Sequence, residues 1–244
     1  MTSSGTSSPL PLIDETLLAT TRYLEALTQL DDEALRGPSV LPGWTRGHVV
    51  AHVSRNADAF ERVLLQAAAG QPASMYDSAE SRNDDIEATV GRHDLAGLRR
   101  DAEEASARLE RAWRGCEADP STPYTRVPGG DDTWPLESVG RRRRAEVEIH
   151  HADLDLGYGP DDWPADFSLA IVKQRQDEMA AEPEGCPSMV LSSTDVDGLW
   201  KFGLGQGPEI HGTAGALAWW LVGRGGGQGL TSSSGELPTP GPWR

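Results

Sequence analysis

Residues 134–156 read WPLESVGRRRRAEVEIHHADLDL, and this stretch decides how the first part of the chain folds. We predict one long helix over it, beginning near Trp134-Pro135. Glu146 and His150 are four residues apart, which places a carboxylate and an imidazole on one helical face about one turn apart. The pattern alone also fits a solvated helical pair, with Arg142 as the ion-pair partner of Glu146.

A second helix is predicted from Thr45, which suits an N-cap, to about Ala69, where Gly70 ends it. His48 and His52 lie one turn apart in this helix and share a face. Histidines in such an apolar run are commonly core or surface residues. The sequence leaves open whether His52 is one of these or a metal ligand.

If His52 faces the other helix, it completes a set of two histidines and one carboxylate with Glu146 and His150. This set suits zinc with one coordination position left open, which is typical of a catalytic site. His151 lies five residues from Glu146 and fits less well. Asp153, three residues after His150, either orients an imidazole, as carboxylates do at zinc sites, or is a charge at the helix end.

Two further long helices are predicted over 13–30 and 94–117, the second with Asp94 as its cap, and a shorter one over 78–89. Four long helices joined by loops indicate an antiparallel bundle. In such a bundle, side chains from facing helices can build a site in the core.

The pattern changes after the turn at 157–160. The predicted elements there are a helix over 164–181, strands over 189–192, 199–202 and 209–211, and a helix over 213–222. The predicted fold class is therefore α+β, with a four-helix bundle domain over 1–156 and a smaller α+β domain over 157–244.

Composition narrows the classes of partner. A net charge of -16 argues against nucleic acid, which needs a basic face. No apolar run approaches the roughly 20 residues that span a bilayer, and residues 1–12 lack the regions of a signal peptide. Cys116 and Cys186 lie far apart, so neither a disulfide framework nor a thiolate zinc site is expected. We expect a cytoplasmic, monomeric protein with a small-molecule substrate and no membrane partner.

Several arginines are candidates for anion binding. Arg224 lies in a glycine-rich loop, where its planar guanidinium suits a carboxylate or an enolate oxygen. Arg82 has similar potential as an anion contact, although both residues could simply be solvated. The run Arg141–Arg144 is interpreted as a solvated helical face with internal ion pairs.

The whole chain resembles the mycothiol-dependent maleylpyruvate isomerase family, with motifs in the family order and spacing. The residues that carry the resemblance are Gly43-Trp44-Thr45-Arg46 with His52, Met75-Tyr76 with 82–86, 146–150 with Asp153-Leu154, Gly223-Arg224-Gly225 and 231–236. The resemblance implies a DinB-like four-helix bundle followed by a sterol-carrier-like α+β domain.

The resemblance also implies the site and the reaction. Zinc, or another divalent metal, is expected on His52, Glu146 and His150, with Arg224 as a catalytic residue. Mycothiol is the implied thiol cofactor, and Arg82 is expected to bind it. The implied reaction converts maleylpyruvate into fumarylpyruvate by zinc-thiolate addition, bond rotation and elimination.

Two other functions stay open at this point. A mycothiol S-transferase would use the same metal and thiol but keep the adduct. A metal-binding protein of the DinB type would bind the metal without thiol-dependent turnover.

Overall fold

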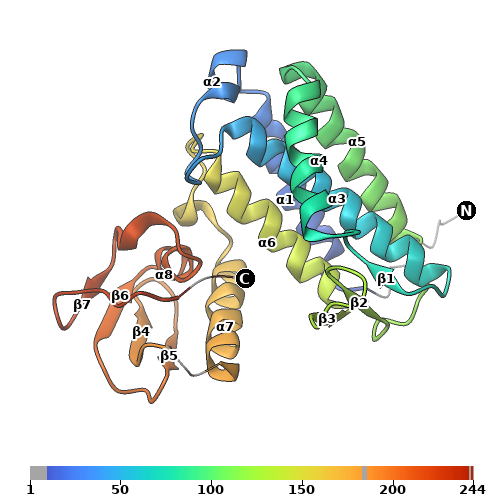
Figure 1. Ribbon diagram of the computed structural model, residues 1–244. Helices are drawn as coiled ribbons and strands as arrows, with labels where there is room; N and C mark the ends of the chain where they lie inside the picture. Colours follow the sequence, from blue (N-terminus) through green and yellow to red (C-terminus); the bar gives the residue numbers. More distant parts are fainter. Residues whose placement is uncertain (1–9, 183–185, 242, 244) are drawn as a thin grey trace, which may run out of the picture. The chain divides into compact units, whose positions relative to one another are not determined.

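Four long helices pack together in the first part of the chain (Figure 1). They are α1 (Ile13–Leu27), α3 (Arg46–Ala68), α5 (Leu95–Arg114) and α6 (Ser138–Asp153), and α1 and α3 each contact both α5 and α6. The shorter α4 (Ala79–Arg92) packs against α3, and α2 (Asp32–Arg36) is a brief turn that the sequence pattern did not predict. The predicted α+β class, a helical bundle followed by a smaller α+β region, is confirmed.

The computed structural model describes residues 10–182, 186–241 and 243. The chain divides into two compact units, the first ending at Leu156 and the second beginning at Gly157. Residues 1–9, part of the segment in which no signal peptide is predicted, lie outside the described residues. Within the described ranges, none of the helices combines the length and apolar character needed to cross a membrane.

Two predicted caps fix where the bundle helices begin. The Thr45 side chain accepts a hydrogen bond from the backbone of His48 at 3.4 Å, and α3 starts directly after it. The Asp94 carboxylate accepts one from the backbone of Gly97 at 2.8 Å, at the start of α5. Each cap satisfies a backbone N–H that has no partner within its own helix.

The predicted start of the helix over 134–156 is wrong by one turn, because α6 begins at Ser138. The preceding residues form β3 (Thr133–Pro135), which pairs antiparallel with β2 (Pro123–Thr125), and β2 pairs parallel with β1 (Ala73–Ser74). The rings of Tyr124 and Trp134 lie opposite each other, 5.7 Å between centroids. This aromatic cross-strand pair stabilises a sheet whose strands are too short to show a sequence pattern.

The second unit combines two helices with a mixed sheet (Figure 1). The sheet order is β5 (Leu199–Phe202), β4 (Met189–Ser193), β6 (Glu209–Gly212) and β7 (Thr231–Ser232), with β4 and β6 parallel and the other pairs antiparallel. Helix α7 (Ala165–Ala181) packs against α8 (Ala214–Leu221) and β5, and two 3-10 turns cover Pro160–Asp162 and Gly225–Gly227.

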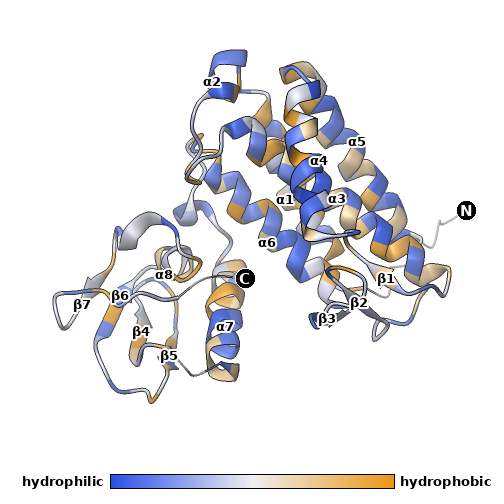
Figure 2. Cartoon of the chain, viewed as in Figure 1, coloured by the Kyte–Doolittle hydropathy of each residue, from blue (hydrophilic) through white to orange (hydrophobic). Residues whose placement is uncertain are grey.

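The interpretation of Arg141–Arg144 as a solvated face is wrong. Arg143 and Arg144 are only 1% and 6% exposed, although Figure 2 shows hydrophilic residues along much of α6. The Arg143 guanidinium donates to the backbone oxygen of Val53 at 2.9 Å and to the side-chain oxygen of Asn56 at 2.7 Å. Both acceptors lie on α3, so the pairing depends on tertiary contact that the local sequence does not reveal.

Gly140 on α6 marks a close approach to the start of α1. A Cβ there would press against the carbonyl of Pro11 and lie 3.0 Å from the Trp113 ring. We expect Gly140→Ala to lower the free energy of unfolding by about 1–3 kcal/mol, the usual cost of overpacking. Chemical denaturation measures this.

Gly91 on α4 is the matched control, because a Cβ there would meet nothing within 4 Å. Gly91→Ala should raise the stability by up to about 1 kcal/mol through helix propensity. Equal stability of the two variants would contradict the close approach at Gly140.

Candidate metal centre

The three residues singled out by their spacing lie together in the first unit. His52 extends from α3, and Glu146 and His150 extend from α6. Their candidate ligand atoms all lie within 4.8 Å of one another. The Glu146 Oε2 atom lies 2.9 Å from His52 Nε2 and 3.4 Å from His150 Nε2. Two imidazole nitrogens and one carboxylate oxygen therefore point at one place.

Asp153 orients the second imidazole. Its Oδ2 atom lies 2.8 Å from His150 Nδ1, and Asp153 is fully buried. The imidazole thus donates through Nδ1 and presents Nε2 to Glu146. Of the two roles considered for Asp153, the structure shows the orienting one, which is common at metal-binding histidines.

His52 is held by aromatic and cationic neighbours. The Trp44 ring meets it in an edge-on arrangement, 5.6 Å between centroids. On α4, Arg82 places Nη2 3.1 Å from His52 Nδ1 and donates through Nη1 to the Asn83 side chain at 2.8 Å. Among the residues that the structure describes, no carboxylate forms an ion pair with Arg82. Its charge is therefore available to a ligand.

Burial and neighbouring groups set the protonation of the trio. Burial, together with the nearby His150, lowers the pKa of His52 from 6.5 to about 4, so His52 is neutral at pH 7. Burial alone would raise the pKa of Glu146, but hydrogen bonds from His150 and His52 hold it well below its ordinary value. Burial opposes the charged form of His150, yet Asp153 and Glu146 raise its pKa.

The residues fit a divalent metal of the zinc type. Three protein ligands with nitrogen and oxygen donors leave a further coordination position open, as in catalytic zinc sites. Glu146 has 27% of its side chain exposed, whereas His52 and His150 have 5% and 8%. A neutral His52 ring that binds a metal through Nε2 carries its proton on Nδ1. Arg82 could then no longer donate a hydrogen bond to His52 Nδ1, and its Nη2 group would need a different acceptor.

The competing histidines have other surroundings. His48 belongs to the cap of α3, and its Nε2 atom lies 3.5 Å from Glu87. His151 is buried edge-on against the Tyr23 ring, 5.9 Å between centroids. Arg142, considered as a partner of Glu146, instead lies over the Trp134 ring at 3.6 Å from its centroid.

Arg224 lies in the second unit, directly before the 3-10 turn at Gly225–Gly227. Its guanidinium donates to the backbone oxygen of Val222 at 2.9 Å and lies 5.5 Å from the centroid of the Trp243 ring. Arg224 as a whole is half-buried.

Tyr76 is a neighbour of the trio to which the sequence pattern assigned no role. It follows β1 and is 9% exposed, and burial together with the negative charge of Glu146 raises the pKa of its hydroxyl. Tyr76 therefore lies close enough to the trio to be influenced by it. A two-residue strand places it there, and that strand left no periodic signal in the sequence.

A helical bundle that brings two histidines and a carboxylate together from facing helices defines the class: a bundle protein with a candidate metal site in its core. Residues 17–155 match the model of the mycothiol maleylpyruvate isomerase N-terminal domain. The chain belongs to this family.

Solved structures agree with this assignment. A crystal structure of the mycothiol-dependent maleylpyruvate isomerase superimposes with a TM-score of 0.86 at 30% identity, covering 96% of this chain and 98% of the other. The H52A mutant of that isomerase gives the same TM-score and coverage at 29% identity. No curated protein matches the chain.

The contact between Asp153 and His150 makes a prediction about metal affinity. Asp153→Asn should weaken zinc binding by about 10–100-fold, because the carboxylate no longer fixes the imidazole. Competition with a chromophoric chelator measures the change.

Asp155→Asn is the control. Asp155 is close in sequence but has 76% of its side chain exposed, and its φ of 54° is one that asparagine tolerates. If both variants bind zinc equally, Asp153 does not position the ligand.

Proposed function

We propose that this protein is a mycothiol-dependent cis-trans isomerase that converts maleylpyruvate into fumarylpyruvate. The observation that carries the proposal is the trio of His52, Glu146 and His150, which leaves a coordination position open in a chain of this family. The similarity to the isomerase crystal structure over nearly the whole chain supports the same activity.

The substrate explains why a thiol and a metal are needed. The cis double bond of maleylpyruvate is conjugated to carbonyl groups, and an intact double bond does not rotate at a useful rate. When bound, zinc would keep the mycothiol sulfur deprotonated, and mycothiol would supply a nucleophile whose reversible addition allows rotation. His52, Glu146 and His150 would hold the metal, and Asp153 would fix the orientation of His150.

The first unit offers no thiol of its own for this role. Cys116 is 2% exposed, lies in an apolar cluster and contacts the backbone oxygen of Leu64 at 3.9 Å. A buried thiol in apolar surroundings is inert. This supports the use of a small-molecule thiol.

Two arginines would bind or stabilise negatively charged groups. Addition of a thiolate moves charge onto an enolate oxygen, which a guanidinium can stabilise. Arg224, partly exposed on its loop, would bind this oxygen or a substrate carboxylate. Arg82, displaced from His52 Nδ1 when a metal is bound, would bind the thiol cofactor beside the metal.

The activity assay follows the ultraviolet absorbance of maleylpyruvate with the zinc-loaded protein, with and without mycothiol. We expect turnover that needs only catalytic amounts of mycothiol and is lost in His52→Ala. Stoichiometric consumption of mycothiol would contradict the isomerase and indicate an S-transferase. Zinc binding without any thiol-dependent turnover would contradict both enzymes.

Arg224→Ala should retain zinc but lose activity. Loss of one group that stabilises a developing oxyanion costs about 100–1,000-fold in turnover, which sets the expected size. Zinc content and turnover are measured on the same preparation. Lys173→Ala is the control in the second unit, because 60% of the Lys173 side chain is exposed. Near-normal turnover of Arg224→Ala would remove this arginine from the mechanism.

A further inference from the structure

In the second unit, a tail packs against the loop that carries Arg224. The tail is defined here as residues 237–241 and 243, which follow β7 and form neither helix nor strand. Pro240 is nevertheless buried, and Leu237 and Trp243 are half-buried. Specific contacts therefore hold this segment in place, and they converge on the Arg224 loop.

The backbone of Arg224 is fixed by α8. The Arg224 N–H donates to the backbone oxygen of Trp219 at 3.0 Å, and the Gly223 N–H donates to that of Trp220 at 2.9 Å. The next turn packs on the same helix, since a Cβ on Gly225 would press against the Trp219 ring. Gly225 also has a φ of 66°, which residues with a Cβ rarely adopt. The base of the Arg224 side chain is thus well determined, but its far end is several rotatable bonds away and needs contacts of its own.

One buried arginine joins the tail to the start of this loop. Arg175 on α7 is 4% exposed and donates to the backbone oxygens of Leu221 at 3.1 Å and Pro240 at 3.2 Å. Leu221 is the last residue of α8. Leu237 approaches the turn after Arg224 so closely that a Cβ on Gly227 would clash with it. The tail and the loop therefore pack as one piece.

Trp243 places its ring against the guanidinium of Arg224. The Arg224 Cζ atom lies 5.5 Å from the ring centroid, within the roughly 6 Å range of a cation–π contact. The same guanidinium donates through Nη1 to the backbone oxygen of Val222 at 2.9 Å. Trp243 Nε1 is buried and has no hydrogen-bond partner among the described residues, so the contact with Arg224 uses the ring and not the indole N–H.

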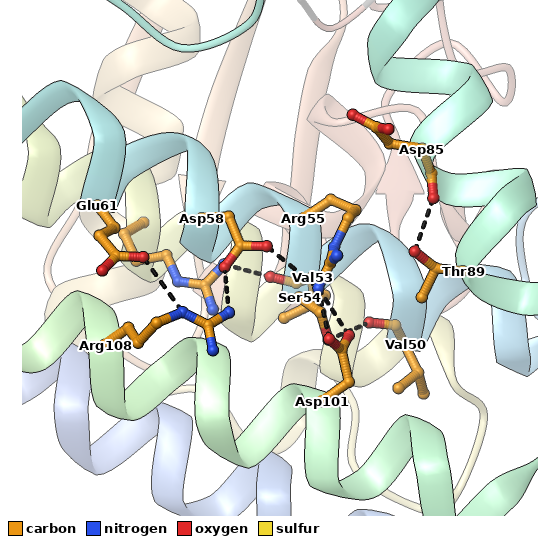
Figure 3. A network of polar contacts seen from close by, with 11 residues as sticks. Val50, Val53, Ser54, Arg55, Asp58, Glu61, Asp85, Thr89, Asp101 and Arg108 are labelled. Atoms are coloured by element: carbon orange, nitrogen blue, oxygen red, sulfur yellow. Dashed lines mark hydrogen bonds and ion pairs between the residues drawn. The ribbon is translucent and has the colours of Figure 1, made fainter. Parts of the chain in front are cut away.

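This support differs from that of the arginines between α3 and α5. Figure 3 shows carboxylates around those guanidinium groups: Arg55 contacts Asp101 at 2.6 Å, and Arg108 contacts Asp58 at 2.7 Å. Such a pair positions the guanidinium and neutralises its charge. An aromatic ring attracts the flat face of a guanidinium without neutralising it, and hydrogen bonds form at the edge of the plane. Stacking thus suits an arginine whose charge acts on a ligand.

We propose that Trp243 is a positioning residue for Arg224: its ring fixes the plane of the guanidinium, so that the N–H edge meets the carboxylate or enolate oxygen of the substrate. The proposal rests on the proposed function, in which Arg224 binds that oxygen. Groups that are oriented in advance stabilise a transition state without reorganising during the reaction. Trp243 acts through Arg224 and needs no contact with the substrate.

Two substitutions separate the aromatic face from apolar bulk. Trp243→Leu keeps an apolar side chain but removes the ring. In the isomerase assay its kcat should fall about ten-fold, less than the roughly 100-fold that a 1 Å misplacement can cost, with zinc content and the KM for mycothiol unchanged. Trp243→Phe should retain most of the turnover, because a phenyl face also attracts a guanidinium and Nε1 has no hydrogen bond to lose.

Trp200→Leu is the matched control. Trp200 is a half-buried tryptophan of the same unit, on β5, and its ring packs against Gly198. Its kcat should equal that of the wild type, and thermal unfolding checks that all variants fold. A Trp243→Leu variant with normal kcat, or a Trp243→Phe variant as impaired as Trp243→Leu, would overturn the proposal.

A double variant distinguishes positioning from packing. If Trp243 acts only through Arg224, Trp243→Leu should cause no further loss of kcat in an Arg224→Ala background, because effects of coupled residues are not additive. The same fold-loss in both backgrounds would assign the ring a packing role and overturn the proposal.

Nuclear magnetic resonance provides a readout that does not need turnover. The Nε–Hε signal of Arg224, assigned by its absence in Arg224→Lys, reports side-chain mobility through nitrogen relaxation. We expect a rigid group in the wild type and Trp243→Phe and a mobile one in Trp243→Leu. If this holds but the wild type turns over no maleylpyruvate, the isomerase proposal fails and the positioning by Trp243 stands. Normal wild-type turnover with Arg224 equally rigid in Trp243→Leu would overturn the positioning and leave the isomerase function in place.

Discussion

Glu148 on α6 is fully buried and accepts a hydrogen bond from Arg22 on α1 at 2.7 Å. Arg144, one turn before it, approaches the same carboxylate at 4.0 Å. A buried carboxylate is costly unless it is paired, and removal of one partner of such a pair typically costs about 3–5 kcal/mol. The packing of α1 on α6 therefore depends on this ion pair, as that of α3 on α6 depends on the contacts of Arg143.

These contacts also determine the register of α6 against α1 and α3. The candidate metal centre depends on that register. Successive residues of a helix are about 100° apart, so a shift of α6 by one residue would turn Val147 and His151 toward α3 in place of Glu146 and His150. The same shift would separate Arg143 from its acceptors on α3. The pairing of buried charges thus holds two candidate ligands opposite His52 before any metal binds.

The sequence predicted what depends on local spacing. Glu146 and His150 share a face because they are four residues apart, and the side chain of Thr45 caps α3 because of its own chemistry. The burial of Arg143 was missed because its acceptors are about 90 residues away. The sheet β1–β2–β3 was missed because strands of two or three residues show no alternation. The position of Tyr76 beside the trio was not predicted either, because Tyr76 lies two residues after this sheet's first strand.

Charge constrains where an anionic substrate can bind. With a net charge of -16, the field of the whole chain disfavours the dicarboxylate of the proposed reaction, so local cations would have to hold it. Arg55 and Arg62 are engaged by aspartates and are poor candidates. Arg82 forms no ion pair with a carboxylate among the described residues, and Arg224 is half-buried on its loop. In the proposed enzyme, Arg82 and Arg224 would then attract the negative charge.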